Sequence, residues 1–479
     1  MRLPIRVANP GLAALIAGSG FRSMPQFANA VNLRGWQMHG VKTLYDHVTV
    51  KRWLGGSICQ YPDVVAAVLS DAWGIPVPVE VIWPELRDGQ PPAPAHLQPW
   101  AAARTLDELG LFLRSDMLTR RAVLAASVSV ATGKELIAPI ARWLSVDTGV
   151  LPLPGGAGPG QINIEAVEAI EEATRHFMAA DAAVGGAVVR RAAAGHLLYA
   201  VDLATEARYS EDIGNRLLIA IADLAGHVGW MSHDAAMEGP AQRYLIYGLQ
   251  AAREAHGDEA QLRAVGILAD MSAQMNELGH PSSALRLTDL AFEQLPADGR
   301  RFNKIRSLLW SQRAARLSGM GTVHLSEVRS AVGLAFDLYG QLNEEDESPA
   351  VARCFPYTTE AEIASSAAKT YRTLALHDPT FAADAERQAL SALALRPPGF
   401  QRSLVFDQIN LAQARFLGGE PEQACQDGAQ AIEMAARVTA SSRVNARLAG
   451  LMTDSEPFKK LSGVREFRER LRTAGDDKQ

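Results

Sequence analysis

The sequence predicts an all-α protein in which a small bundle of helices precedes a long array of helical repeats. Three observations lead to this fold class. Alanine and leucine are abundant, whereas aromatic residues make up only 6% of the chain. Apolar residues recur at helical spacing through most of the sequence. A frame of small residues returns several times in the second half of the 479 residues, which is typical of a repeat protein.

Basic residues are concentrated at one end of the chain. The net charge is −6, yet residues 1–60 hold seven Lys and Arg against a single acid, Asp46. This segment is therefore at +6, and the rest of the chain is at −12. The division fits a basic first domain that contacts an anionic partner, with chance clustering in a short window as an equal alternative.

Residues 1–85 are expected to form the first domain, with four or five short helices. The first three helices begin beside a residue that can cap them, namely Asn9, Ser23 and Asp46, and Asp63 stands just after Pro62 at the start of the fourth. The apolar residues that helical spacing turns inward are Leu12, Leu15, Ile16, Phe27, Ala28, Val31, Val50, Trp53, Leu54, Val64, Val65, Val68, Leu69 and Trp73.

Two segments rich in proline or glycine divide the rest of the chain. Residues 86–100 are Pro-rich and residues 151–161 are rich in Gly and Pro, so both are expected to be linkers. Residues 101–150 between them are expected to form a helical connector, and the sequence leaves open whether it packs on the first domain or on the repeats. Residues 162–479 are expected to form the repeat domain.

Three stretches of the repeat domain share one frame: a small residue, another seven positions on, an alanine five further, and a small residue after seven more. These positions are Gly229, Ala236, Ala241 and Gly248; Ser272, Gly279, Ala284 and Ala291; Ala412, Gly419, Ala424 and Ala431. The spacing resembles the tetratricopeptide repeat, in which small residues let the two helices of a hairpin approach closely. Further helices are expected over Arg301–Leu317, Glu360–His377 and Arg387–Leu395.

The segment YDHVTVKRWLGG, Tyr45 to Gly56, has the pattern of a DNA-reading helix. In a repressor-type helix-turn-helix, the second helix buries one apolar stripe and lays its other side in the major groove. A stripe at Val50, Trp53 and Leu54 leaves the following residues for base edges and phosphates: His47, Val48, Thr49, Lys51 and Arg52. Arg34 and Lys42 are further candidates for phosphate contact. A purely structural helix is the alternative that periodicity alone favours.

Two parts of the chain resemble one known family. Tyr45–Gly56 and the stretch Pro62–Val77, which ends in WGIPV, are similar to the amino-terminal module of actinobacterial (Streptomyces-type, NsdA-like) regulators. Leu224–Ala255 and Ile267–Leu285 are similar to the repeats of the same family. Its members join a repressor-like helix-turn-helix to a tetratricopeptide-type body. Gly55 stands where this family usually has arginine, so one expected phosphate contact is missing.

The resemblance implies a DNA-binding transcriptional regulator of development (sporulation) or of antibiotic biosynthesis, and the family includes a repressor. We expect a homodimer that binds double-stranded DNA, and the sequence leaves open whether it represses or activates transcription. We expect a peptide, small-molecule or protein effector in the groove of the repeat domain, beside Tyr199, Trp230, Tyr244 and Tyr247. For each of these aromatic residues, simple repeat packing is the alternative. The alternative for the whole protein is a repeat scaffold or adaptor that contacts other proteins without binding DNA.

No catalytic or cofactor site is predicted. ATGKEL, Ala131–Leu136, has Glu135 where a P-loop needs Ser or Thr, and Gly155–Gly160 lacks the preceding strand of a dinucleotide site. His227 and His233 are six positions apart, which does not suit a shared metal on a helix. We therefore expect no enzyme activity, no cofactor and no metal.

The sequence also predicts a cytoplasmic protein without membrane contact. Cys59, Cys354 and Cys425 form no CxxC pair, which favours a reducing compartment. The first residues do not resemble a secretory signal, and no apolar run is long enough to span a bilayer.

Overall fold

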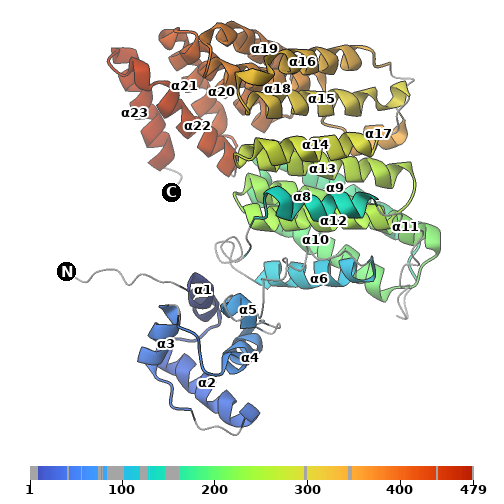
Figure 1. Cartoon of the computed structure of the whole chain (residues 1–479), viewed down its shortest axis with the longest axis vertical. Coiled ribbons are helices and arrows are strands. Elements are labelled where there is room, and N and C mark those ends of the chain that lie inside the picture. The colour runs from blue at the N-terminus through green and yellow to red at the C-terminus, as the bar shows by residue number, and fades with distance from the viewer. Residues whose placement is uncertain are drawn as a thin grey trace. The chain divides into compact units, whose positions relative to one another are not determined.

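The computed structural model describes residues 9–39, 43–55, 57–73, 77, 79–83, 102–118, 128, 130–145, 161–295, 299–343, 348–438 and 441–476. Every regular element in these ranges is a helix, so the all-α prediction is confirmed (Figure 1). None of the helices in the described ranges has the length and apolar character needed to cross a membrane. All three cysteines are free thiols.

The chain divides into two compact units. One contains Met1–Gln98 with Leu111–Val130, and the other contains Pro99–Gly110 with Ala131–Gln479. We call the described residues 9–83 the head and the described residues 161–476 the array. Each is described by itself below.

The head contains five helices in its described residues. They are α1 (Pro10–Gly18), α2 (Met24–His39), α3 (His47–Leu54), α4 (Pro62–Trp73) and the single turn α5 (Val79–Ile82). Their boundaries follow the expected caps: the Asn9 side chain accepts from the backbone N–H of Leu12, and that of Asp46 from Thr49. Asn9 also donates to the carbonyl of Ile82 at 2.8 Å, which ties the start of α1 to the end of α5.

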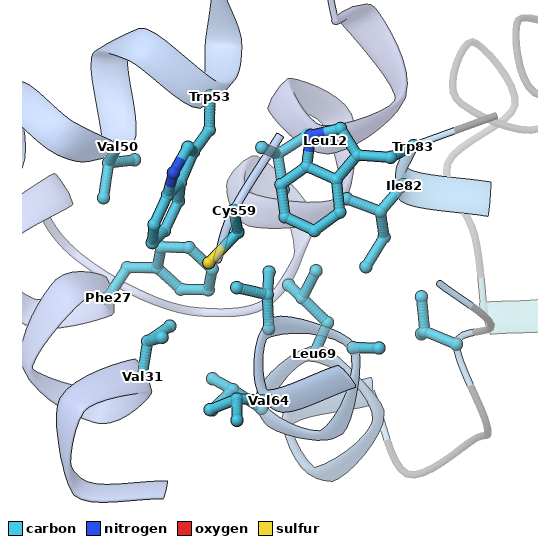
Figure 2. Packing of buried hydrophobic residues seen from close by; sticks show 14 of the residues in the cluster. Leu12, Phe27, Val31, Val50, Trp53, Cys59, Val64, Leu69, Ile82 and Trp83 are labelled. Atoms are coloured by element: carbon cyan, nitrogen blue, oxygen red, sulfur yellow. The ribbon is translucent and has the colours of Figure 1, made fainter. Parts of the chain in front are cut away.

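A single apolar core holds the head together, and its fully buried members run from Leu12 to Trp83 (Figure 2). Trp53 of α3 is part of this core and makes edge-to-face contact with Tyr45 (ring centroids 4.9 Å apart) and with Trp83 (6.3 Å). The inward residues expected for α3, Val50, Trp53 and Leu54, are all buried. Trp73 and two residues of α1, Leu15 and Ile16, are only partly buried and pack against the edge of the core.

The array is a succession of helical hairpins (Figure 1). Its helices are α9 (Ile164–Val184), α10 (Gly186–Glu206), α11 (Glu211–Asp234), α12 (Glu238–Glu254), α13 (Asp258–Glu277), α14 (Pro281–Glu293), α15 (Asn303–Ser318), α16 (Leu325–Gly340), α17 (Pro349–Cys354), α18 (Glu360–Ala375), α19 (Ala382–Leu395), α20 (Gln401–Leu417), α21 (Pro421–Ala435), α22 (Ser442–Asp454) and α23 (Ser462–Asp476). Short 3-10 turns precede α15, α16 and α19, and another follows α22.

The three expected repeat frames coincide with the hairpins α11–α12, α13–α14 and α20–α21. At Gly229 of α11, a Cβ would lie 2.9 Å from the Leu245 side chain of α12, so a larger residue would force the helices apart. In the next hairpin, the buried Ser272 hydroxyl donates to the carbonyl of Ala284 at 2.8 Å. Gly419 turns the third hairpin with a φ of +81°, a conformation that favours glycine.

The three helices expected between these frames are present as α15, α18 and α19. The prediction for α19 began five residues late, at Arg387 instead of Ala382. The cause is local: Asp378 caps a 3-10 turn, Pro379–Phe381, that leads directly into the helix.

Part of the expected connector belongs to the array unit. Its helices are α6 (Ala102–Leu118), within which the two units divide, and α8 (Gly133–Ser145). Just before α8, the backbone N–H and carbonyl of Ala131 are both bonded to the Gln242 side chain of α12, at 2.8 Å each. Thr105 in the first half of α6 is hydrogen-bonded to Glu254 at the end of α12. The connector is therefore not a separate domain in its described residues.

Candidate functional site

The approach to α3 is held by one side chain of α2. Asn32 donates to the carbonyl of Tyr45 at 2.8 Å, and its Oδ1 accepts from the Tyr45 backbone N–H and from the Thr43 hydroxyl, at 2.8 and 2.9 Å. The Tyr45 ring packs against Trp53 in the core. Because the chain before α3 is bonded to α2 and its inward face is buried, α3 has a defined position on the head.

The outer side of α3 presents the residues that the sequence proposed for DNA contact. His47, Val48, Lys51 and Arg52 are exposed, and Thr49 is half-buried. In the described part of the chain, neither Lys51 nor Arg52 has a carboxylate within ion-pair distance. The structure therefore places these side chains together on one accessible surface, while their contact with DNA stays a prediction.

Thr49 differs from the other four candidate residues of α3 because its side chain already donates a hydrogen bond within the protein. Asp46 Oδ1 accepts from both the backbone N–H and the hydroxyl of Thr49, each at 2.8 Å. These hydrogen bonds lower the pKa of Asp46, so this exposed carboxylate is charged at the front of α3. An acid at the leading end of the helix repels phosphate, and the Thr49 hydroxyl can offer a base only its acceptor side.

Arg34 is not a free cation. It lies on α2, and its guanidinium forms an ion pair with Asp71 of α4 at 3.2 Å. The other candidate outside α3, Lys42, lies outside the described residues. The head's available positive charge in the described ranges is thus concentrated at Lys51 and Arg52, with Arg22 ahead of α2 as a further exposed base.

The comparisons with known proteins point to this part of the chain. Residues 12–82 match the SP15 N-terminal domain family. The match to the SP15 N-terminal domain begins at Leu12 and ends at Ile82, which are both fully buried in the head core. Its extent thus coincides with the folded head and includes all of α3. No curated protein and no solved structure matches the chain.

The four aromatic residues proposed for an effector groove do not share a surface. Tyr244 and Tyr247 of α12 keep 0% and 3% of their surface accessible, so their assignment to an open groove was wrong. Tyr199 of α10 is 51% exposed. Trp230 of α11 is half-buried beneath the Arg443 guanidinium, 4.9 Å from its ring centroid. Aromatic residues are equally good at hairpin packing, and their type does not tell which face of the repeat they occupy.

The first helices of the array's hairpins face a common interior, because residues far apart in the sequence meet there. Ser441, just before α22, donates to Asp234 at the end of α11 at 2.7 Å. Arg443 of α22 holds both carboxylate oxygens of Glu277 on α13, at 2.8 and 2.5 Å. The Arg402 guanidinium of α20 likewise donates to both carboxylate oxygens of Asp181 on α9, at 2.7 and 2.9 Å. The array therefore curls until its last hairpins touch its first.

Charged side chains line this interior. Burial opposes ionisation of Glu277, but Arg443 and a hydrogen bond from His233 outweigh it and hold the pKa of Glu277 well below its usual value. Burial raises the pKa of Asp270, also on α13, to about 7. No group of three metal-ligating side chains occurs within the described ranges.

Sequence reasoning did not predict the charged interior of the array. A signal was present, because Lys369 and Arg372 are one turn apart on α18, and Arg443 and Arg447 are one turn apart on α22. Such pairs also occur on ordinary solvated helices, however. Only tertiary contacts, of Arg443 with Glu277 on α13 and of Lys369 with Phe406 on α20, show that these particular pairs face inward.

Proposed function

We propose that the protein is a DNA-binding transcriptional regulator whose head reads DNA with α3. The observation that carries this proposal is the exposed side of α3, where Lys51 and Arg52 have no carboxylate partner in the described part of the chain. A helix in the major groove needs accessible donors and cations on a rigid support. The hydrogen bonds of Asn32 and the buried Trp53 supply that support.

The array is proposed to sense an effector and to mediate dimerisation, as expected for a regulator of development or antibiotic production. An effector can change DNA affinity only if it binds two arrangements of the protein unequally. The charged interior, where helices from both ends of the array meet, is a place where a bound ligand can favour one arrangement. A cytoplasmic location follows from this proposal, since the partner is DNA.

The test is a titration of the full-length protein onto fragments of its own upstream region at several salt concentrations. Specific binding should weaken steeply as salt rises, because cations that neutralise phosphates release counterions. Replacing both Lys51→Ala and Arg52→Ala should reduce the slope of log affinity against log salt by about 0.9 for each phosphate that is no longer neutralised. The matched control is Arg465→Ala with Arg472→Ala, which removes the same charge from the exposed side of α23.

The proposal fails if the double variant of α3 binds the fragments as tightly as the wild-type protein does. It also fails if the control variant of α23 loses as much affinity, because net charge alone would then explain the binding. Circular dichroism spectra of all three proteins check that the head remains folded.

A second candidate function is that of an adaptor whose head binds another protein. The favouring observation is a group of exposed apolar side chains: Leu33 and Trp36 on α2, at 61% and 59% accessible, and Leu44 before α3, at 82%. Replacing Trp36→Ser should then abolish partner retention by the full-length protein. In a DNA-binding head that does not use α2, the same change should leave the salt titration unaltered.

A further inference from the structure

Not every cation of the array interior has a carboxylate partner in the described residues. One such cation, Arg316 of α15, donates instead to the Ser272 hydroxyl at 3.0 Å. Lys369 and Arg372 of α18 and Arg447 of α22 are half-buried, and none has an acidic group within ion-pair distance in the described residues. Their surroundings differ from those of the neighbouring arginines. Arg443 is bound to Glu277, and Arg396 to Glu362 and Asp407.

The side chain of Phe406 brings Lys369 of α18 close to Arg443 of α22. The Lys369 ammonium is 5.9 Å from the Phe406 ring centroid, and the Arg443 guanidinium is 5.3 Å from the same centroid. Lys369 comes from α18, Phe406 from α20 and Arg443 from α22. Three helices that are successive first helices of hairpins thus meet around one ring.

The cluster continues one helical turn further along the same helices. Gln413, two turns after Phe406, donates to Asp454 of α22 at 2.6 Å, so α20 and α22 run past each other in the same direction. Arg372 and Arg447 follow Lys369 and Arg443 by one turn each and therefore lie on the same side. The Nε of Arg372 is buried and has no hydrogen-bond partner.

Electrostatics agree with a shortage of negative charge here. Burial, together with the nearby charge of Arg447, lowers the pKa of Arg372 to about 10. Burial also lowers the pKa of Lys369 and of Arg447, and the attraction of Glu362 or Glu277 does not restore it. None of the nearby carboxylates forms an ion pair with these three cations. Glu277 is bound by Arg443 and Glu362 by Arg396, while Asp454, which attracts Arg372 and Arg447, is hydrogen-bonded to Gln413.

We propose that Lys369, Arg372 and Arg447 bind the phosphate or diphosphate group of a small molecule, which is the effector of the regulator. The role of the ligand as an effector rests on the proposed function, whereas its binding to these three side chains does not. Two guanidinium groups and one ammonium match the charge of such a group and can donate several hydrogen bonds to its oxygens. The half-buried position within the curled array favours a small ligand over a nucleic acid.

The experiment is isothermal titration calorimetry of the full-length protein with sodium diphosphate, without DNA and at low ionic strength. We expect one site per chain and a rise in the unfolding temperature with diphosphate, because a ligand of the folded state stabilises it. Replacing Arg372→Gln together with Arg447→Gln should weaken binding at least about tenfold for each guanidinium removed. Arg465→Gln with Arg472→Gln on α23 is the matched control and should bind as the wild-type protein does.

The double variant should keep or raise the unfolding temperature of the free protein, since it removes two like charges that lack counter-charges. Lys369→Met provides an independent variant with the same expected loss of binding. Absence of diphosphate binding to the wild-type protein overturns the inference, as does undiminished binding by the variants. Tighter binding of citrate than of diphosphate overturns the assignment to phosphate.

Failure of this inference and failure of the proposed function are separable. Diphosphate binding is measured without DNA, so its absence leaves the salt titration of α3 unaffected. Conversely, failure of the wild-type protein to bind DNA would leave the diphosphate titration unchanged. If both succeed, diphosphate should shift the DNA titration of the wild-type protein but not that of the Arg372→Gln, Arg447→Gln variant.

Discussion

Lys51 and Arg52 of the head are exposed on α3, whereas Arg396 and Arg443 of the array keep only 1% and 15% of their side chains accessible. The head buries apolar side chains around Trp53 and keeps its cations in water. The array buries cations as well and pairs Arg396, Arg402 and Arg443 with carboxylates from other helices. A solvated cation costs little to keep free, so it suits contact with a polyanion. A desolvated cation needs a counter-charge, from the chain or from a ligand.

The largest expected effect tests whether the head is stable by itself. Trp53→Ala removes an aromatic ring from the head core and should destabilise it by about 3–5 kcal/mol, as loss of a buried aromatic side chain usually does. The head should become sensitive to protease while the array stays resistant, which mass spectrometry of the fragments would show. Val48→Ala, on the exposed side of α3, is the control and should leave the head resistant. Protease sensitivity of the array in Trp53→Ala would contradict a self-contained head.

The next effect tests the buried charges of the array. Arg396 donates to Asp407 and Glu362, at 2.9 Å each, and Asp407 is completely buried. Arg396→Met should destabilise the array by about 3 kcal/mol in chemical denaturation, because it leaves the buried Asp407 carboxylate without its cation. The loss of stability should not be larger than this, because burial raises the pKa of Asp407 to about 6. Protonation of Asp407 can therefore remove the unpaired charge.

Two further variants complete this test. Arg387→Met breaks an ion pair with Asp384 in which the arginine is exposed, and should change stability by less than about 1 kcal/mol. Adding Asp407→Leu to Arg396→Met should recover part of the loss, because both charges then leave the interior. Equal losses from the exposed and the buried pair would remove the distinction between them.

A smaller effect concerns pH. Burial raises the pKa of Glu254 on α12 to about 8, and its hydrogen bond with Thr105 only partly offsets this. The unfolded chain therefore loses the Glu254 proton at a lower pH than the folded chain does, so stability should fall as pH rises from about 4.5 to 8. Glu254→Gln should reduce the fall in unfolding temperature between about pH 5 and pH 8. The remaining fall should come from Asp270 and Asp407, whose pKa values burial also raises. Glu433→Gln, at an exposed site of α21, is the control and should keep the wild-type slope.

The smallest effect sharpens the role of α3. Gly55 ends this helix with a φ of −81°, which other residues adopt, and it is exposed. Gly55→Arg should add one phosphate contact and steepen the slope of log affinity against log salt by about 0.9. Gly55→Ala, which adds no charge, should leave the slope unchanged. Weaker DNA binding by Gly55→Arg than by Gly55→Ala would place this end of α3 away from the phosphates.

Much of the head could be predicted because its signals are local. The spacing of Val50, Trp53 and Leu54 identifies the buried face of α3, and Asp46 marks its first turn. Side chains from elsewhere in the head decide the rest. Neither the hydrogen bonds of Asn32 to Thr43 and Tyr45 nor the pairing of Arg34 with Asp71 follows from spacing along one helix.

The hairpins of the array could also be predicted, because close helix contact demands small residues such as Gly229 and Ser272 at fixed intervals. Which aromatic residues are accessible on the array could not be predicted. Tyr244, Tyr247 and Trp230 all lie in sequence with a helical pattern. Tyr244 and Tyr247 are nevertheless buried, on the second helix of the hairpin. The face that a helix turns inward depends on how successive hairpins rotate, and this rotation adds up over the whole array.

By itself, the sequence determined the all-helical fold, the hairpin frames and the exposed side of α3, since each depends on residues within a few turns of one another. Only the tertiary structure decided which charges are paired. Arg443 meets Glu277 across 166 positions of the chain, while Lys369, Arg372 and Arg447 are left without a carboxylate in the described ranges. The attraction between two charges depends on their separation in space and not on their separation along the chain. The curled array brings together residues that no local sequence pattern connects.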